Sequence, residues 1–141
     1  MSDFKDVTSI TPNITELEAA TGISIGSDVR LLHQIGKRVL RKQRLESLLV
    51  TQGRFGMTLF EPRKAPLHIP IYGSDEVADV TGAGDTVIAV FTLALACGAS
   101  PEIAARLANY AGGIVVMKRG TATVTRDELA AAIKKDSSRV Q

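Results

Sequence analysis

Several features that would exclude an ordinary intracellular enzyme are missing from this sequence. A single cysteine, Cys97, rules out an intrachain disulfide and fits a reducing cytoplasm. No apolar run approaches the ~20 residues of a membrane-spanning helix, because the longest extends only from Val87 to Cys97. The polar start, residues 1–6, lacks the basic-then-apolar layout of an export signal. Together these absences predict a cytoplasmic chain without membrane contact.

An excess of charge of one sign is also lacking. The chain has 17 Lys and Arg against 15 Asp and Glu, a net charge of +2, which is too small to steer it towards nucleic acid or membrane. Its one basic concentration, Lys37 to Arg44, has no interleaved aromatic residues that could stack on bases. We interpret it as a solvated helix face and expect no nucleic-acid partner. His33 and His68 have no second ligand at metal-binding spacing, which argues against zinc.

What the sequence does contain is an alternation of strand-like and helix-like segments. The run Leu48 to Val50 is continuously apolar, which is typical of a strand buried on both faces of a parallel sheet. Strands are expected at residues 7–10, 48–50, 57–60 and 67–72, and helices at 13–21, from 27 onward, at 84–97, from 100 towards 117, and at 126–135. This order predicts an α/β fold, with a mostly parallel sheet and flanking helices.

Two packing expectations follow from the same patterns. In the helix that begins near residue 27, apolar residues recur at three- and four-residue steps and predict one buried face, made of Val29, Leu32, Gly36, Val39 and Leu40. Cys97 follows an apolar run just before Gly98, and we interpret it as a small buried hydrophobe at a helix end.

A glycine-rich turn carries the most informative chemistry. Gly82-Ala83-Gly84-Asp85 leads directly into the helix at 84–97, and its small residues allow a ligand to approach the backbone closely. The unpaired N–H groups of a helix start attract phosphate oxygens. An aspartate there could accept a proton from a substrate hydroxyl. The alternative is ordinary: such turns are common, and an Asp in a first turn can simply cap a helix.

The whole segment Asp79 to Asp85 resembles the D-T-G-A-G-D signature of the ribokinase/PfkB carbohydrate kinases, with Val80 inserted after the first Asp. The resemblance implies a ribokinase-like fold, ATP as phosphoryl donor and a sugar phosphate as the second substrate. It assigns Asp85 as the catalytic base. It assigns Gly82, Ala83 and Gly84 as the backbone anion hole.

A second motif of that family concerns the metal. Asn13-Ile14-Thr15-Glu16 is similar to the N-x-x-E motif that organises Mg²⁺ and phosphate, so the resemblance makes Asn13 and Glu16 the metal-associated residues. An Asn N-cap with Glu three residues later is also an ordinary helix-capping pair.

Further segments resemble the family's nucleotide site. Val50 to Gly56 is similar to its strand-end T-x-G-x-x-G, which implies phosphate contacts at Thr51 and Gly53. Asn109 matches the helix that borders the adenine pocket, although a polar residue on an amphipathic helix would look the same. Lys118 to Thr121 matches the following nucleotide loop and implies a role for Gly120. Some relatives bind a monovalent cation here, and the equivalent positions would be Asp79, Thr81 and Gly120.

The resemblance extends from Thr11 to about Ile133 and is strongest to the heptose-phosphate kinases of lipopolysaccharide-core precursor synthesis. It implies transfer of the ATP γ-phosphoryl group to D-glycero-β-D-manno-heptose 7-phosphate. These kinases carry a long N-terminal half that has no counterpart here, so residues 1–141 correspond to the C-terminal, nucleotide-binding portion. We therefore expect a homo-oligomer or pairing with the missing half. The alternatives are an inactive nucleotide-binding fragment or interaction module and, more weakly, a nucleic-acid-binding domain.

Overall fold

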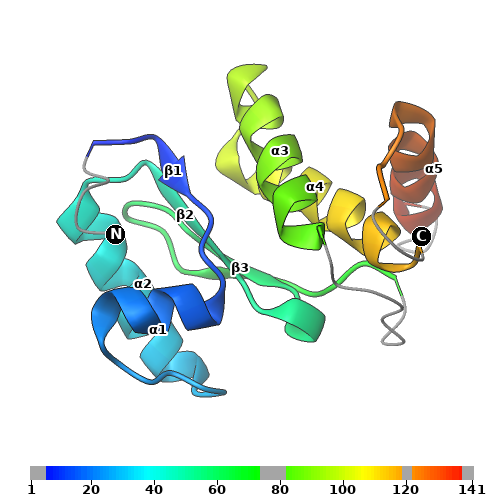
Figure 1. Cartoon of the computed structure of the whole chain (residues 1–141). Helices are drawn as coiled ribbons and strands as arrows, with labels where there is room; N and C mark the ends of the chain where they lie inside the picture. The colour runs from blue at the N-terminus through cyan, green and yellow to red at the C-terminus, as the bar shows by residue number, and fades with distance from the viewer. Residues whose placement is uncertain (1–5, 74–81, 119–121, 138–141) are drawn as a thin grey trace. The chain divides into compact units, whose positions relative to one another are not determined.

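The computed structural model describes residues 6–73, 82–118 and 122–137, which belong to two compact units (Figure 1). Unit 1 ends at Ile69, and unit 2 begins at Pro70. Unit 1 combines a sheet with helices, whereas the described part of unit 2 is helical.

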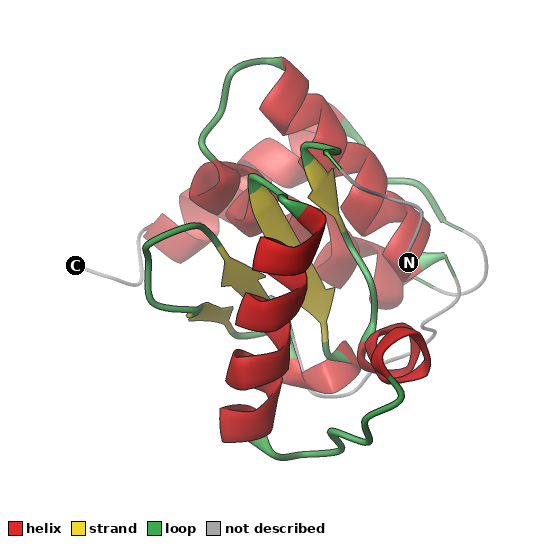
Figure 2. Ribbon diagram, turned by 90° about the vertical axis from the view of Figure 1, so that its left-hand side faces the viewer, coloured by secondary structure: helices red, strands yellow, loops and turns green. Residues whose placement is uncertain are grey.

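Unit 1 begins with a strand, two helices and a second strand, and then continues through two hairpin-like connections. Its elements are β1 (Ser9–Ile10), α1 (Ile14–Thr21), α2 (Val29–Gln43), β2 (Ser47–Thr51), the 3₁₀ turn η1 (Gly53–Phe55), β3 (Met57–Phe60) and β4 (Leu67–Ile69). The strands form one sheet in the order β1-β2-β3-β4. Figure 2 shows the strands in yellow among the red helices.

The sheet is mixed. β1 pairs with β2 in parallel, whereas β2–β3 and β3–β4 are antiparallel. The helices and sheet confirm the expected α/β class, but the expected predominance of parallel pairing is wrong for this sheet. A parallel pair needs a crossover of about a dozen residues or more, and only the β1–β2 connection, with α1 and α2, is that long. The apolar run of β2 correctly indicated burial on both faces, since Leu48, Leu49 and Val50 are all 0% exposed.

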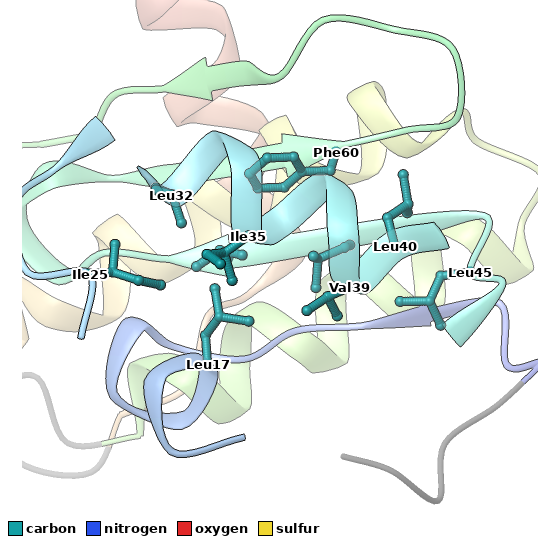
Figure 3. Close-up of a cluster of buried hydrophobic side chains, with 10 residues drawn as sticks. Leu17, Ile25, Leu32, Ile35, Val39, Leu40, Leu45 and Phe60 are labelled. Carbon is teal, nitrogen blue, oxygen red and sulfur yellow. The ribbon is translucent and has the colours of Figure 1, made fainter. Parts of the chain in front are cut away.

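One face of the sheet carries the hydrophobic core of unit 1. Leu48 of β2 and Phe60 of β3 pair directly across the strands, and both contribute to a cluster with α1 and α2. Figure 3 shows this cluster, whose members are Leu17, Ile25, Leu32, Ile35, Val39, Leu40, Leu45, Leu48, Val50 and Phe60. Full burial of each large side chain stabilises the fold by about 1.5–3 kcal/mol.

The apolar face predicted for α2 is largely confirmed. Leu32, Gly36, Val39 and Leu40 are buried, and a Cβ at Gly36 would overlap the ring of Phe60, so this glycine is required for close packing. The expectation for Val29 is wrong, because this residue is 57% exposed. Asp28 caps α2 and accepts the N–H of Leu31, so Val29 is the first helical residue and lies outside the packed turns.

Unit 2 contains α3 (Ala83–Ala96), α4 (Pro101–Val116) and α5 (Arg126–Ser137), and α4 packs against both other helices. The helix expected from residue 100 is confirmed as α4, which has Ser100 as N-cap and Pro101 in its first turn. Cys97 is exposed, so its predicted burial is wrong. Within the described ranges, no helix combines the length and apolar character needed to cross a bilayer.

Candidate active site

The predicted anion hole lies at the start of α3. Gly82 is the N-cap residue, with φ of 79°, a left-handed conformation that glycine adopts without strain. It has no side chain to accept a first-turn N–H, in contrast to Asn13, Asp28 and Ser100, which cap α1, α2 and α4. Helix geometry leaves the first N–H groups without intrahelical partners. The start of α3 is therefore suited to an anion.

The space beside this turn is open. A Cβ built on Gly82 or Gly84 would meet no heavy atom within 4 Å, so a ligand has room to approach the backbone. The first helical turn is closed by Thr86, which donates both its N–H (3.0 Å) and its Oγ1 (3.1 Å) to the carbonyl of Gly82. Asp85 lies in this turn and is exposed to solvent. Gly82, Ala83, Gly84 and Asp85 thus form one continuous, accessible turn.

A second cluster of predicted residues lies in unit 1, where β1 and β2 end. Asn13 and Thr51 form a parallel bridge, and the Thr51 N–H donates to the Pro12 carbonyl at 3.0 Å. Asn13 is 38 positions before Thr51 in the chain, so the fold brings the predicted metal motif next to the predicted phosphate motif. Ligands of open α/β sheets bind at the carboxyl ends of parallel strands.

Asn13 and Glu16 form a complete capping box. The Glu16 N–H donates to Asn13 Oδ1 at 2.8 Å, and the Asn13 N–H donates to Glu16 Oε2 at 2.9 Å. The capping alternative is therefore confirmed as geometry, while the metal role stays a prediction. Among the residues that the structure describes, no three His, Cys, Asp or Glu gather into a metal-binding group. The donor set fits Mg²⁺, which keeps several waters and takes few protein ligands beside phosphate.

Gly53 lies just beyond β2 and opens the turn η1. Its φ is 57°, and a Cβ there would meet nothing within 4 Å, so the backbone is open to a ligand. Two hydrogen bonds of Gln52 hold this turn in place. The Gln52 N–H donates to the Gly56 carbonyl at 2.8 Å, and Thr58 Oγ1 donates to Gln52 Oε1 at 2.6 Å. Sequence reasoning missed the Gln52–Thr58 pair, because it forms only once β3 folds back on β2.

Asn109 has a structural partner. It is 8% exposed, and its Nδ2 donates to the carbonyl of Pro70 at 2.8 Å, which ties α4 to the segment after β4. Its neighbour Tyr110 donates its hydroxyl to Asp136 Oδ2 of α5 at 2.6 Å and contacts the ring of Tyr72 edge-on. The hydrogen bond to Asp136 raises the pKa of Tyr110 to about 12. The predicted nucleotide contact of Asn109 stays a prediction.

The last predicted segment is only partly described. Gly120, Asp79 and Thr81 lie outside the described residues. Lys118, at the start of the predicted nucleotide loop, donates to the Thr123 carbonyl at 2.7 Å and pairs with Glu128 Oε1 at 2.7 Å. Thr125 and Glu128 form a capping box at the start of the helix predicted at 126–135, with bonds of 2.8 and 3.3 Å. Hydrogen bonds to Glu128 lower its pKa to about 2; the bond from Lys118 has the largest effect, followed by those from Thr125.

Comparison with known proteins gives a consistent result. Residues 3–128 match the profile described as pfkB family carbohydrate kinase. The bifunctional protein HldE of Pectobacterium atrosepticum is 48% identical over 133 residues, which are 94% of this chain and 27% of that protein. The same-named protein of Methylococcus capsulatus is 47% identical over 130 residues, again 27% of its length.

A solved structure of Arabidopsis thaliana ribokinase, complexed with ribose and ATP, superposes with a TM-score of 0.83 at 28% identity. The superposition covers 93% of this chain and 42% of the ribokinase chain. The fold is therefore ribokinase-like, and the chain spans about a quarter of the length of the curated relatives that it matches.

Proposed function

Because the chain belongs to the pfkB family of carbohydrate kinases, we propose that it is the C-terminal, nucleotide-binding portion of an ATP-dependent sugar kinase. The observation that carries this proposal is the start of α3. There an N-cap without a side chain, open space over Gly82 and Gly84, and the accessible Asp85 occupy one turn. Phosphoryl transfer requires such an anion seat beside a proton acceptor.

In the proposed reaction, the Asp85 carboxylate accepts the proton of the sugar hydroxyl as the hydroxyl oxygen forms its bond to the γ-phosphorus. The bond from that phosphorus to the β-bridging oxygen breaks, and ADP leaves with the electron pair. The first-turn amides at Gly82, Ala83 and Gly84 stabilise the charge on the transferred group, because they are fixed in place before the reaction.

The residues of unit 1 have supporting roles in this proposal. Asn13 and Glu16 would organise Mg²⁺, which neutralises phosphate charge when bound. Thr51 and Gly53 would contact the nucleotide phosphates, and the bridge from Asn13 to Thr51 supports a common task for the two motifs. Asn109 and Gly120 complete the proposed nucleotide contacts.

For the sugar, we propose D-glycero-β-D-manno-heptose 7-phosphate, phosphorylated at its anomeric hydroxyl. The support is the sequence resemblance to heptose-phosphate kinases and the 48% identity to a bifunctional HldE protein. Because the chain spans 27% of that relative, the sugar contacts would come in large part from a separate portion of the kinase.

Isothermal titration of the 141-residue chain with Mg·ATP tests the proposal. Gly84→Leu places a side chain in the open space beside the turn without requiring a positive φ, and it should weaken Mg·ATP binding at least tenfold. Ala130→Leu, at an exposed position of α5, is the matched control and should bind like the wild type. Equal binding by wild type and Gly84→Leu would refute the assignment of this turn, as would a wild-type chain that binds no Mg·ATP.

A further inference from the structure

A cavity of about 110 Å³ lies between the last turn of α1 and the later turns of α2. Ala20 and Thr21 line it from α1, and its remaining lining residues belong to α2, so the whole cavity is part of unit 1. A water molecule needs about 10–15 Å³ of such space. The cavity therefore has room for a ligand larger than a single water molecule.

One wall of this cavity is positively charged. Arg38 and Lys42 both line it, and they lie side by side on α2 because they are four positions apart. Gln43, which is 5% exposed, brings a buried polar side chain to the same wall. None of the lining residues is Asp or Glu, and within the described ranges no ion pair involves Arg38 or Lys42.

The helix dipole explains only part of this charge. Cations stabilise the C-terminal turn of a helix, and Lys42 lies in the last turn of α2. Arg38 lies one turn earlier, where the dipole gives no reason for a cation, and it repels Lys42 at this spacing. The ends of α1 and α2 contribute about half a negative charge each. The two full positive charges outweigh them, so the wall attracts anions.

The rest of the cavity is apolar. Ile35 and Val39 line it, and both are buried members of the core cluster in Figure 3. An inorganic ion would leave this part of the lining without a contact. The lining therefore suits a ligand that joins an anionic group to a small carbon skeleton.

We propose that the cavity between α1 and α2 binds a small organic phosphate monoester. A phosphate monoester carries close to two negative charges near neutral pH, which matches Arg38 and Lys42. A guanidinium group can also bond two phosphate oxygens at once. The inference goes beyond the proposed function, because Asn13 lies at the other end of α1, about 12 Å away along an eight-residue helix. The cavity is thus separate from the proposed metal motif.

The test is a titration of the ¹⁵N-labelled 141-residue chain with phenyl phosphate, followed by amide chemical shifts. The shifts should concentrate at residues 20–22 and 35–43. Phenyl phosphate should bind at least threefold more tightly than inorganic phosphate, because its ring can contact the apolar lining. The double variant Arg38→Gln, Lys42→Gln should weaken phenyl phosphate binding at least tenfold.

A second double variant, Lys37→Gln, Arg41→Gln, is the matched control. It removes the same charge from exposed positions of the same helix, including one cation of the last turn, but changes no residue that lines the cavity. Its Kd for phenyl phosphate should change less than threefold at 0.15 M salt, where charges outside the cavity are largely screened. Circular dichroism of both double variants should match the wild type.

Three results would overturn the proposal: no shifts at residues 20–22 and 35–43, equal losses of affinity in the two double variants, or equal affinities for phenyl phosphate and inorganic phosphate. The cavity and the kinase proposal can fail separately. Gly84→Leu should leave the phosphate titration at α1 and α2 unchanged, and Arg38→Gln, Lys42→Gln should leave Mg·ATP binding unchanged.

Discussion

At Asp85, the proposed chemistry depends on one carboxylate. In the kinase formed by this chain and the rest of its fold, Asp85→Asn should lower kcat by about 10²–10⁴, the scale of general-base loss. The KM for ATP should change little, because the anion hole consists of backbone amides. Steady-state kinetics with Asp127→Asn as control decide this, since Asp127 is an exposed carboxylate in α5. A near-wild-type kcat in Asp85→Asn would remove the assignment.

Glu16 has an observed structural role and a proposed metal role, and one substitution separates them. Glu16→Gln retains a side chain that can complete the capping box, so the stability loss should be about 1 kcal/mol or less. If Glu16 organises Mg²⁺, the kinase formed by this chain and the rest of its fold should need a severalfold higher Mg²⁺ concentration for half-maximal activity. Asp28→Asn, the corresponding change at the cap of α2, should leave the Mg²⁺ titration unchanged. If the Mg²⁺ titrations of Glu16→Gln and wild type superimpose, the metal role is refuted and only the capping role of Glu16 remains.

Local residue roles could be predicted from the sequence, whereas long-range partners could not. The caps at Asn13, Ser100 and Thr125 each bond to a residue three positions further on, so a short sequence pattern is enough to predict them. The partner of Asn109 is 39 positions away, and that of Tyr110 is 26 positions away. Such contacts depend on how the elements pack, which no local pattern encodes.

Within unit 2, α4 owes its position to a glycine. A Cβ on Gly113 would overlap the Tyr72 carbonyl oxygen and lie 3.0 Å from its carbonyl carbon. Because backbone cannot rotate away as a side chain can, Gly113→Ala should destabilise the fold by about 1–3 kcal/mol despite its better helix propensity. Gly84→Ala adds the same methyl group to α3 in open space and should cause no loss. Urea denaturation of both variants provides the comparison.

The stability that the start of α5 contributes to the fold should depend on pH in the acidic range. The pKa of Glu128 is lowered to about 2 by Lys118 and Thr125, against an ordinary value near 4.3 in an unfolded chain. The stabilisation is therefore complete above about pH 4.3 and is lost as the pH falls towards 2. Glu128→Gln should flatten the dependence of Tm on pH across this window while leaving the dependence at higher pH unchanged. If Tm falls equally steeply with pH in Glu128→Gln and in the wild type below pH 4.3, this prediction is wrong.

The helices were easier to predict than the sheet. α1, α4 and α5 have caps written into the sequence, and their predicted starts agree with the structure. The sheet was expected to be mostly parallel because β2 is continuously apolar. Such a run indicates burial only, whereas strand direction follows from connection length. The short segments 52–56 and 61–66 require antiparallel neighbours, and their length was the better signal.

Taken as a whole, the 141-residue chain should bind ATP or ADP weakly and transfer no phosphoryl group. Transfer needs both reactants held in line, and the portion expected to hold the sugar is not among these residues. A coupled ADP-release assay with heptose 7-phosphate should give background rates for the chain alone, and higher rates once the N-terminal portion of a relative is present. Sugar-dependent ADP release by the chain alone would show that it is a complete kinase.

Tyr72 and Tyr110, which are in contact, give unit 2 a fluorescence signal that unit 1 lacks. The chain has no Trp and two Tyr, and both tyrosines belong to unit 2. A phenol bonded to a carboxylate, as Tyr110 is to Asp136, is quenched by proton transfer in the excited state. Intrinsic fluorescence should therefore brighten when α5 leaves α4 and should be insensitive to events confined to unit 1. Recorded beside circular dichroism, which senses every helix, it reveals whether the two units melt as one.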